Sequence, residues 1–311
     1  MKTTQISTAR TLNSTKTSAN DNEKKGKKKR NILLLLLNNN TNKNTDTNTN
    51  RNNNRRNTDV IRIFNAMRGS KSSASTRALQ REREAINKEI IKWERKDRAD
   101  CERFGYPELI VFDLDACFWT KEMYQLQVVC TERDRIFCER TNTCIGVRSG
   151  ERTVIELHEG ARKALEEYLD GKYPGARLAT ASSADTPLAV SIGKSALSLL
   201  EIIPGVSCAS VFAIGFEQEF AGNMQIGRTK PLSSNKSETH FSILRKETNV
   251  PYDKMLFFDD CNWEDHCAAV ESRCVENGLG PCVKRTPKGL GIQEWESALA
   301  KYKARHEQYN K

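Results

Sequence analysis

The stretch 108-ELIVFDLDACFWT-120 places a short apolar run directly before two aspartates, Asp113 and Asp115. Three further apolar runs follow along the chain, at residues 176–181, 210–216 and 254–260. Helix-like stretches separate the later runs, at residues 159–169, 186–202 and 237–248. Continuous apolar runs that alternate with helices indicate a parallel sheet covered on both faces. The sequence therefore predicts an α/β fold with a doubly wound sheet.

Acidic and hydroxyl side chains stand where these predicted strands end. In doubly wound sheets, ligands bind outside the carboxyl ends of the strands. Several carboxylates in one dry crevice repel each other unless a cation lies among them, and all-oxygen ligation favours a hard ion such as Mg²⁺. We therefore expect a magnesium site built from residues at the strand ends. The residues expected there are Asp113, Asp115, Ser182, Asp259 and Asp260.

Four motifs carry a family resemblance. They read FDLDACFW, LATASS, SNKSETHF and MLFFDDCNWED, and together they extend over residues 107–299. The set resembles the haloacid dehalogenase superfamily of phosphatases, and within it the magnesium-dependent phosphatase group. The resemblance implies a Rossmann-like doubly wound sheet with helices on both faces, a small flap instead of a cap domain, and phosphomonoester hydrolysis with Mg²⁺ as cofactor.

The resemblance also implies a role for individual residues. Asp113 would be the nucleophile that forms an aspartyl-phosphate, and Asp115 would protonate the leaving oxygen and then activate water. Mg²⁺ would be held by the Asp113 carboxylate, the Asp115 carbonyl and Asp260, with Asp259 nearby. The implied substrate-binding residues are Leu114, Asp115, Ser182, Ser183 and Lys236.

The chain departs from the family pattern at four positions. Cys117 replaces a Thr or Val of similar size, and Ser183 replaces an arginine, which removes a charged contact to phosphate or substrate. Lys236 lies one position farther from the motif's histidine than usual, so Lys230 is a rival for the phosphate-binding lysine. Glu264 replaces an asparagine and would add a carboxylate near the metal.

The insert after the first motif limits the shape of the site. Only some 66 residues separate Asp115 from Ser182, too few for a separate helical cap, and 146-GVRSGERT-153 is turn-like. An open site suits either a phosphorylated protein side chain, phosphotyrosine above all, or a small sugar phosphate. A non-catalytic phosphatase-like module, tethered by a basic tail to nucleic acid or an acidic partner, is the alternative function.

Aromatic residues near the motifs allow two interpretations. Trp119 and Tyr124 either line the site or pack at the sheet edge. Cys261 and Trp263, beside the second acidic pair, are expected to pack where the following helix begins.

The chain divides into three parts by composition. Residues 1–100 carry 24 Lys and Arg against 10 Asp and Glu, and residues 101–311 carry 26 against 30. We expect a disordered basic tail over residues 1–74, an amphipathic helix over 75–104 and the phosphatase domain over 105–311. The basic run at 24–30 is a solvated tail, a nuclear-localisation signal or a nucleic-acid patch, and a Ser/Thr-rich start also fits an organelle transit segment.

All ten cysteines lie beyond residue 100 and form no C-x-x-C pair. We expect reduced thiols in an intracellular, cytoplasmic or nuclear protein, although Cys130, Cys138 and Cys144 leave a metal or disulfide cluster open. The longest apolar run has six residues, 32–37, where a membrane span needs about 20. We therefore infer no membrane span. We also expect no membrane among the partners, and a monomer.

Overall fold

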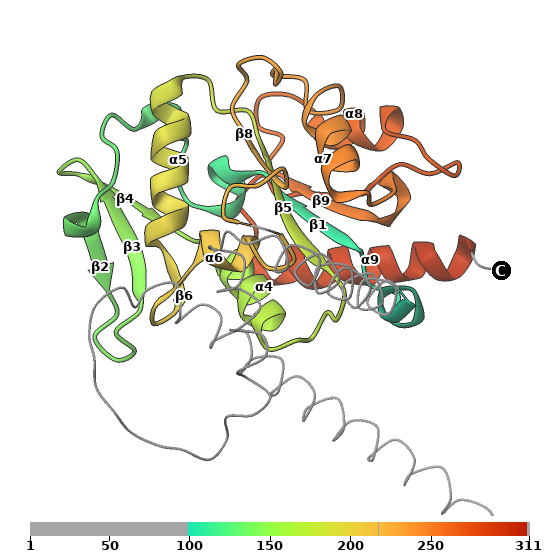
Figure 1. Cartoon of the computed structure of the whole chain (residues 1–311), viewed down its shortest axis with the longest axis horizontal. Helices are drawn as coiled ribbons and strands as arrows, with labels where there is room; N and C mark the ends of the chain where they lie inside the picture. Colours follow the sequence, from blue (N-terminus) through green and yellow to red (C-terminus); the bar gives the residue numbers. More distant parts are fainter. Residues whose placement is uncertain (1–98, 217, 310–311) are drawn as a thin grey trace, which may run out of the picture.

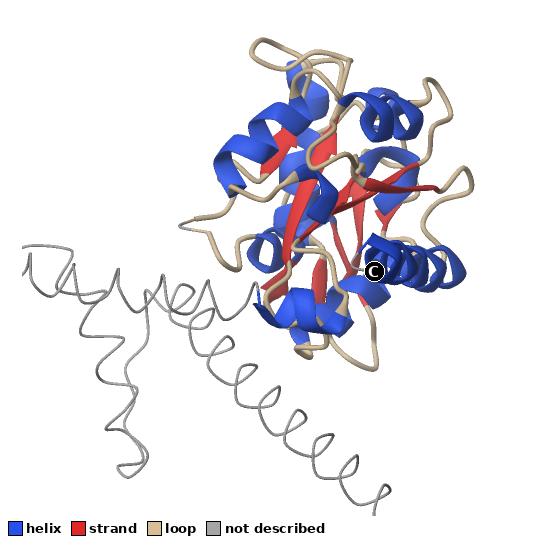
Figure 2. Cartoon of the chain, turned by 90° about the vertical axis from the view of Figure 1, so that its right-hand side faces the viewer, coloured by secondary structure: helices blue, strands red, loops and turns tan. Residues whose placement is uncertain are grey.

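The computed structural model describes residues 99–216 and 218–309, and its centre is a parallel sheet with helices on both faces (Figures 1 and 2). The sheet has five strands in the order β10-β9-β1-β5-β8. This is the predicted α/β doubly wound class. The strands are β1 (Leu109–Phe112), β5 (Arg177–Ser182), β8 (Met224–Ile226), β9 (Met255–Asp259) and β10 (Cys282–Arg285).

The apolar run that precedes Asp113 forms the central strand. All four residues of β1 are buried, and their side chains alternate between two cores on opposite faces of the sheet. Ile110 and Phe112 pack in one core, Leu109 and Val111 in the other. Burial on both faces explains why this strand reads as a continuous apolar run rather than an alternating one.

Two layers of helices enclose the sheet. One core includes buried side chains of α4 (Glu159–Leu169), α5 (Pro187–Leu199), α6 (Cys208–Phe212) and α9 (Ile292–Tyr309). The other core includes those of α7 (His240–Thr248) and α8 (His266–Arg273). The helix predicted over 159–169 is confirmed at both ends, whereas the predicted 186–202 and 237–248 are each shorter in the structure.

Residues 210–216 are not a strand, so this prediction was wrong. The Ser207 hydroxyl accepts a hydrogen bond from the Ser210 backbone N–H and caps helix α6. Val211 and Phe212 belong to this helix, and their apolar side chains are buried in the core. The edge of the sheet is taken by β8, a strand of three residues that is too short to stand out in the sequence.

A small antiparallel sheet takes the place of a helical cap. It consists of β2 (Arg135–Phe137), β3 (Cys144–Ser149) and β4 (Thr153–Glu156), with the predicted turn between the last two. Short segments complete the insert and the later loops: η1 (Leu114–Phe118), η2 (Met123–Gln125), η3 (Glu132–Asp134), β6 (Glu201–Ile203), β7 (Val206–Ser207) and η4 (Tyr252–Lys254). The flap is thus three-stranded.

Several expectations concern residues outside the described part. The tail over 1–74 and most of the helix predicted over 75–104 lie there, and residues 99–104 of that helix are helical. Within the described residues, all ten cysteines are free thiols, including Cys130, Cys138 and Cys144. In that same part of the chain, no helix has the length and apolar character needed to cross a membrane.

Candidate active site

The parallel register brings the predicted site residues to one edge of the sheet. Phe112, the last residue of β1, pairs with Thr180 of β5 and Phe258 of β9. The backbone N–H of Asp113 continues this pairing with a 2.9 Å hydrogen bond to the carbonyl of Phe258. The side chains that follow these three strands therefore meet in one place.

Three carboxylates form the centre of the site. Asp113, Asp259 and Asp260 are buried, and each offers an oxygen within 4.8 Å of the others. Burial, opposed in part by Lys236, raises the pKa of Asp113 well above its ordinary value. Burial and the neighbouring Asp259 raise the pKa of Asp260. Burial is the largest cause of both shifts, and the neighbouring carboxylates add to it, so this cluster disfavours additional negative charge.

The loops after β1 and β9 each contain a residue with left-handed backbone, and the turn after β9 holds two of the acids in place. Ala116 and Cys261 have left-handed φ values of 51° and 56°, which non-glycine residues seldom adopt. The turn at Cys261 lets its N–H donate to Asp259 Oδ1 at 2.8 Å. The next N–H, from Asn262, donates to Asp260 Oδ2 at 3.1 Å. The two backbone N–H groups of this left-handed turn thus orient both carboxylates.

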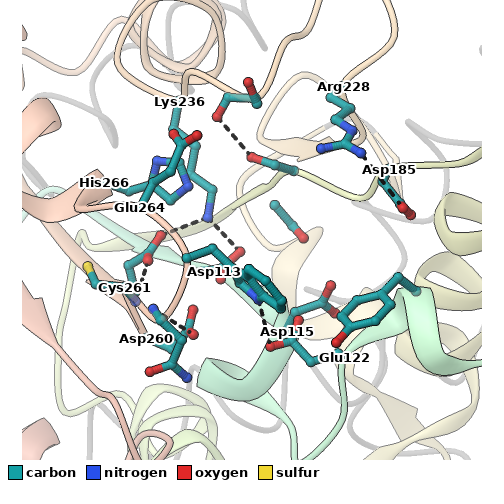
Figure 3. Close-up of a pocket in the computed structure, with 17 residues that line it drawn as sticks. Asp113, Asp115, Glu122, Asp185, Arg228, Lys236, Asp260, Cys261, Glu264 and His266 are labelled. Carbon is teal, nitrogen blue, oxygen red and sulfur yellow. Dashed lines mark hydrogen bonds and ion pairs between the residues drawn. The ribbon is translucent and has the colours of Figure 1, made fainter.

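Lys236 is a buried cation among these acids. Its Nζ lies 2.8 Å from Asp113 Oδ1 and 2.7 Å from Asp259 Oδ2, as Figure 3 shows for Asp113. Burial opposes the charge on Lys236, but the two carboxylates outweigh burial and raise its pKa. Lys230, the rival on the same loop, is exposed and does not line the pocket. The structure therefore places Lys236 in the site.

Ser182 contributes a hydroxyl that lacks a partner. It is the last residue of β5, is 1% exposed and lines the pocket, and its Oγ makes no hydrogen bond within the described structure. Ser183 is half-buried, and its hydroxyl donates to the carbonyl of Ser234 at 3.3 Å. Because buried hydroxyls are normally satisfied, Ser182 Oγ is available to a ligand oxygen.

Asp115 lies beside the cluster. Its Oδ1 accepts a hydrogen bond from the Trp119 indole at 3.3 Å, and the Met123 backbone also binds the carboxylate. Burial and the nearby Glu122 raise the pKa of Asp115 to about 7, so the carboxyl group exchanges a proton near neutral pH. Trp119 is fully buried and does not line the pocket, so the interpretation of this residue as a packing residue is confirmed.

These groups line one pocket of about 330 Å³ (Figure 3). Leu114 is not among its lining residues, because its side chain is buried in the core. The strands of the small sheet add no lining residue. The charged lining residues are Asp113, Asp115, Glu122, Asp185, Asp259, Asp260 and Glu264, opposed by Lys236 and Arg228. The exposed Glu264 does add a carboxylate to the rim, but it lies outside the three-acid cluster.

His240 is a buried residue that positions neighbouring elements of the site, and the sequence did not predict this role. It is fully buried, and its Nε2 lies 3.1 Å from the Ser182 carbonyl and 3.0 Å from the Gly227 carbonyl. As donor to these carbonyls, the imidazole joins the ends of β5 and β8 to the first turn of α7, next to the loop that carries Lys236. Its place in SNKSETHF was the available signal, but its partners are far away in sequence.

The rim residues differ in one respect from the sequence-based expectation. Trp263 was expected to pack where α8 begins, but it is 74% exposed and lines the pocket. Tyr124 also lines the pocket and is 51% exposed. Cys261 is half-buried against the core formed with α7 and α8, as expected, and it also lines the pocket.

The site suits a hard divalent cation. Asp113, Asp259 and Asp260 offer only oxygen ligands, and hard ions such as Mg²⁺ prefer carboxylate and carbonyl oxygen. The seven acids against two cations in the lining give the pocket an excess of negative charge that a divalent ion would reduce. The residues present therefore fit the metal that the motifs imply.

Comparison with protein families and curated proteins gives one result. The family model described as Acid Phosphatase, a family of magnesium-dependent phosphatases of the haloacid dehalogenase type, matches residues 105–305. The match covers nearly all of the described fold and every residue of the pocket. No curated protein matches the chain.

Proposed function

The chain belongs to the Acid Phosphatase family of phosphomonoester hydrolases, and from this premise we propose that it acts through a covalent aspartyl-phosphate on Asp113. The observation that carries the proposal is the grouping of Asp113, Lys236 and the unpartnered Ser182 hydroxyl in one pocket. A carboxylate nucleophile, a cation and a free donor are the parts that phosphoryl transfer needs.

In the first step, a carboxylate oxygen of Asp113 attacks phosphorus while the bond to the leaving oxygen breaks. Asp115, in its protonated form, donates its proton to that oxygen, so the alcohol leaves neutral. Lys236 and the Ser182 hydroxyl hold the phosphoryl oxygens. Asp113, Asp260 and the Asp115 carbonyl, with Asp259 nearby, would hold Mg²⁺, which would supply the positive charge that lets an anionic nucleophile approach phosphate.

In the second step, the Asp115 carboxylate removes a proton from water, and the resulting hydroxide attacks the phosphorus. The bond between phosphorus and Asp113 breaks, which releases inorganic phosphate and restores both acids to their starting protonation states. The same carboxyl thus acts first as acid and then as base, which requires a pKa close to the working pH. Burial of Asp115 is consistent with this use.

The substrate class follows from the open pocket. A capless site admits either phosphotyrosine on a protein or a small sugar phosphate, and we carry both classes forward. Hydrolysis of 4-nitrophenyl phosphate with and without Mg²⁺ tests the activity, and a panel of phosphopeptides and phosphometabolites tests the substrate. Absence of Mg²⁺-dependent hydrolysis across the panel would leave a non-catalytic, partner-binding role.

The covalent step has its own test. In Asp115→Asn the first step with 4-nitrophenyl phosphate can proceed, because 4-nitrophenolate leaves without protonation, whereas activation of water is lost. We expect a phosphorylated protein to accumulate, with the phosphoryl group on the peptide that contains Asp113 in mass spectrometry. Phosphate found on another residue would contradict the assigned nucleophile.

A further inference from the structure

Two exposed aromatic side chains stand at the mouth of the pocket. Tyr124 follows the first motif on η2, and Trp263 lies in the loop between β9 and α8. Their rings meet edge to face, with centroids 6.0 Å apart and an interplanar angle of 81°. The other exposed large apolar residues among those described, such as Phe137 and Leu188, do not line the pocket.

Trp263 is unusually exposed for a tryptophan, and a hydrogen bond holds its side chain in place. A side chain of this size is usually largely buried, yet 74% of it is open to solvent. Its indole Nε1 donates to Glu122 Oε1 at 3.4 Å, and Glu122 also lines the pocket. The Tyr124 hydroxyl accepts a hydrogen bond from Gln125 at 3.2 Å. Both rings are therefore held at the rim while about half of Tyr124 and most of Trp263 stay open to solvent.

The position of Asp115 defines where the leaving group must lie. The acid that protonates the leaving oxygen has to be within hydrogen-bond reach of it. Asp115 is bound by the backbone of Met123, the residue next to Tyr124. Figure 3 shows Asp115 and Glu122 together on one side of the pocket, with Arg228 and Asp185 on the other. A leaving group that is bonded to Asp115 therefore points toward the aromatic pair.

We propose that Tyr124 and Trp263 bind the ring of an aromatic leaving group, and that they make the enzyme selective for aryl phosphates over aliphatic ones. The inference rests on the proposed phosphatase activity, whose substrate class it narrows. Aromatic rings attract each other in edge-to-face and offset arrangements beyond the gain from buried area. A linear aliphatic leaving group makes fewer such contacts and gains less from the pair.

The chemistry of the rim agrees with a neutral ring. Arg228 lies 3.7 Å from Asp185 and offsets its charge, but Glu122 and Glu264 add carboxylates around the opening, which disfavours leaving groups that carry their own negative charge. A phosphorylated phenol side chain has no charge beyond its phosphate. Since Glu122 already occupies the indole N–H, Trp263 offers its ring face rather than a polar group.

Kinetics with two substrates test the selectivity. Trp263→Ala and Tyr124→Ala should each lower kcat/KM for phenyl phosphate by about tenfold, and lower it for glycerol 1-phosphate by less than about twofold. Trp263→Phe keeps a ring and should restore most of the loss. Phe137→Ala, which removes an exposed aromatic side chain outside the pocket, serves as the matched control and should change neither value.

Binding of unreactive analogues separates this inference from the proposed activity. Calorimetry in the presence of Mg²⁺ should show that Trp263→Ala weakens phenylphosphonate about tenfold and methylphosphonate by less than about twofold. Unequal losses support the aromatic contact even if the protein shows no turnover. Absence of turnover would overturn only the phosphatase mechanism. Equal losses for both analogues, no loss, or no binding of phenylphosphonate to the wild-type protein overturn the inference.

Discussion

The ammonium of Lys236 lies 2.8 Å from the carboxylate of Asp113, and both side chains are nearly excluded from solvent. A third buried group, Asp259, shares the same ammonium at 2.7 Å. The three side chains come from the end of β1, the end of β9 and the loop before α7, so the pocket exists only in the folded chain. Lys236 thereby limits the repulsion between two acids and leaves a cation where phosphate oxygens would bind.

Replacement of Asp113 by Asn should abolish turnover and leave the fold intact. The amide has the same shape but is a far weaker nucleophile, and it removes one negative charge from a buried cluster of acids. We expect a far-UV circular dichroism spectrum like that of the wild type and a melting temperature that is not lower. A variant that keeps more than a few per cent of the wild-type rate would exclude the covalent mechanism.

Replacement of Lys236 by Met should reduce both activity and stability. Asp113 and Asp259 would lose their shared cation. Removal of one partner of a buried ion pair lowers the free energy of unfolding by roughly 3–5 kcal/mol. Loss of a charged phosphate contact should lower kcat/KM by at least about a hundredfold. Urea unfolding and hydrolysis of 4-nitrophenyl phosphate measure the two effects.

Lys230→Met is the control for this experiment, because Lys230 is exposed on the same loop and lies outside the pocket. We expect wild-type stability and activity. A large loss of activity in Lys230→Met together with a normal rate in Lys236→Met would reverse the assignment of the two lysines.

His240 should make the protein less stable in acid. Burial and the nearby Lys236 lower its pKa from 6.5 to about 4, so the unfolded chain binds this proton more readily than the folded one. The stability from the neutral imidazole is fully present above pH 6.5 and is lost as the pH falls toward 4, by about 3 kcal/mol in full.

The matching experiment is urea unfolding at several pH values between 4.5 and 7. Relative to the wild type, His240→Gln should be less stable at pH 7, and the difference should shrink as the pH falls. His306→Gln, at a half-buried site on α9, should alter the pH dependence less. A constant difference between His240→Gln and the wild type would show that His240 does not titrate in this way.

Beryllofluoride, an analogue of the phosphoryl group on Asp113, should bind only when Mg²⁺ is present. The analogue adds anionic character to a pocket that already contains Asp113, Asp115, Asp259 and Asp260, and Lys236 alone does not balance it. The melting temperature should rise with Mg²⁺ and beryllofluoride together, and change little with beryllofluoride in chelator.

Two variants calibrate this response. Asp260→Asn removes a proposed metal ligand and should abolish the joint rise in melting temperature, whereas Asp185→Asn changes an acid on the rim and should retain it. An equal rise with and without Mg²⁺ in the wild type would mean that the acids are not a metal site.

Much of the site could be predicted from the chain because of one topological rule. Continuous apolar runs indicated parallel strands, and the ends of adjacent parallel strands lie at the same edge of the sheet. Asp113, Ser182 and Asp259 were therefore expected together, and the structure brings them together. The helix over 159–169 was predicted because its helix-like sequence is local to one segment.

Other features depended on contacts between distant segments. The run at 210–216 is equally apolar as a strand or a helix, and the cap at Ser207 and the packing of Phe212 decide for a helix. Loop residues show no periodic pattern from which one could predict whether their side chains are buried or exposed. The burial of Lys236 and the exposure of Trp263 therefore emerge only once α7, α8 and the end of β9 are packed.

The sequence by itself thus determined the class of fold and the acids of the site, because strand ends and their neighbours are encoded locally. Tertiary structure alone decided which lysine is buried with those acids, and that His240 joins the ends of β5 and β8. It also decided that Tyr124 and Trp263 meet at the rim. The physical reason is that each of these contacts joins side chains from separate loops, whose relative positions are set by the packing of the whole domain.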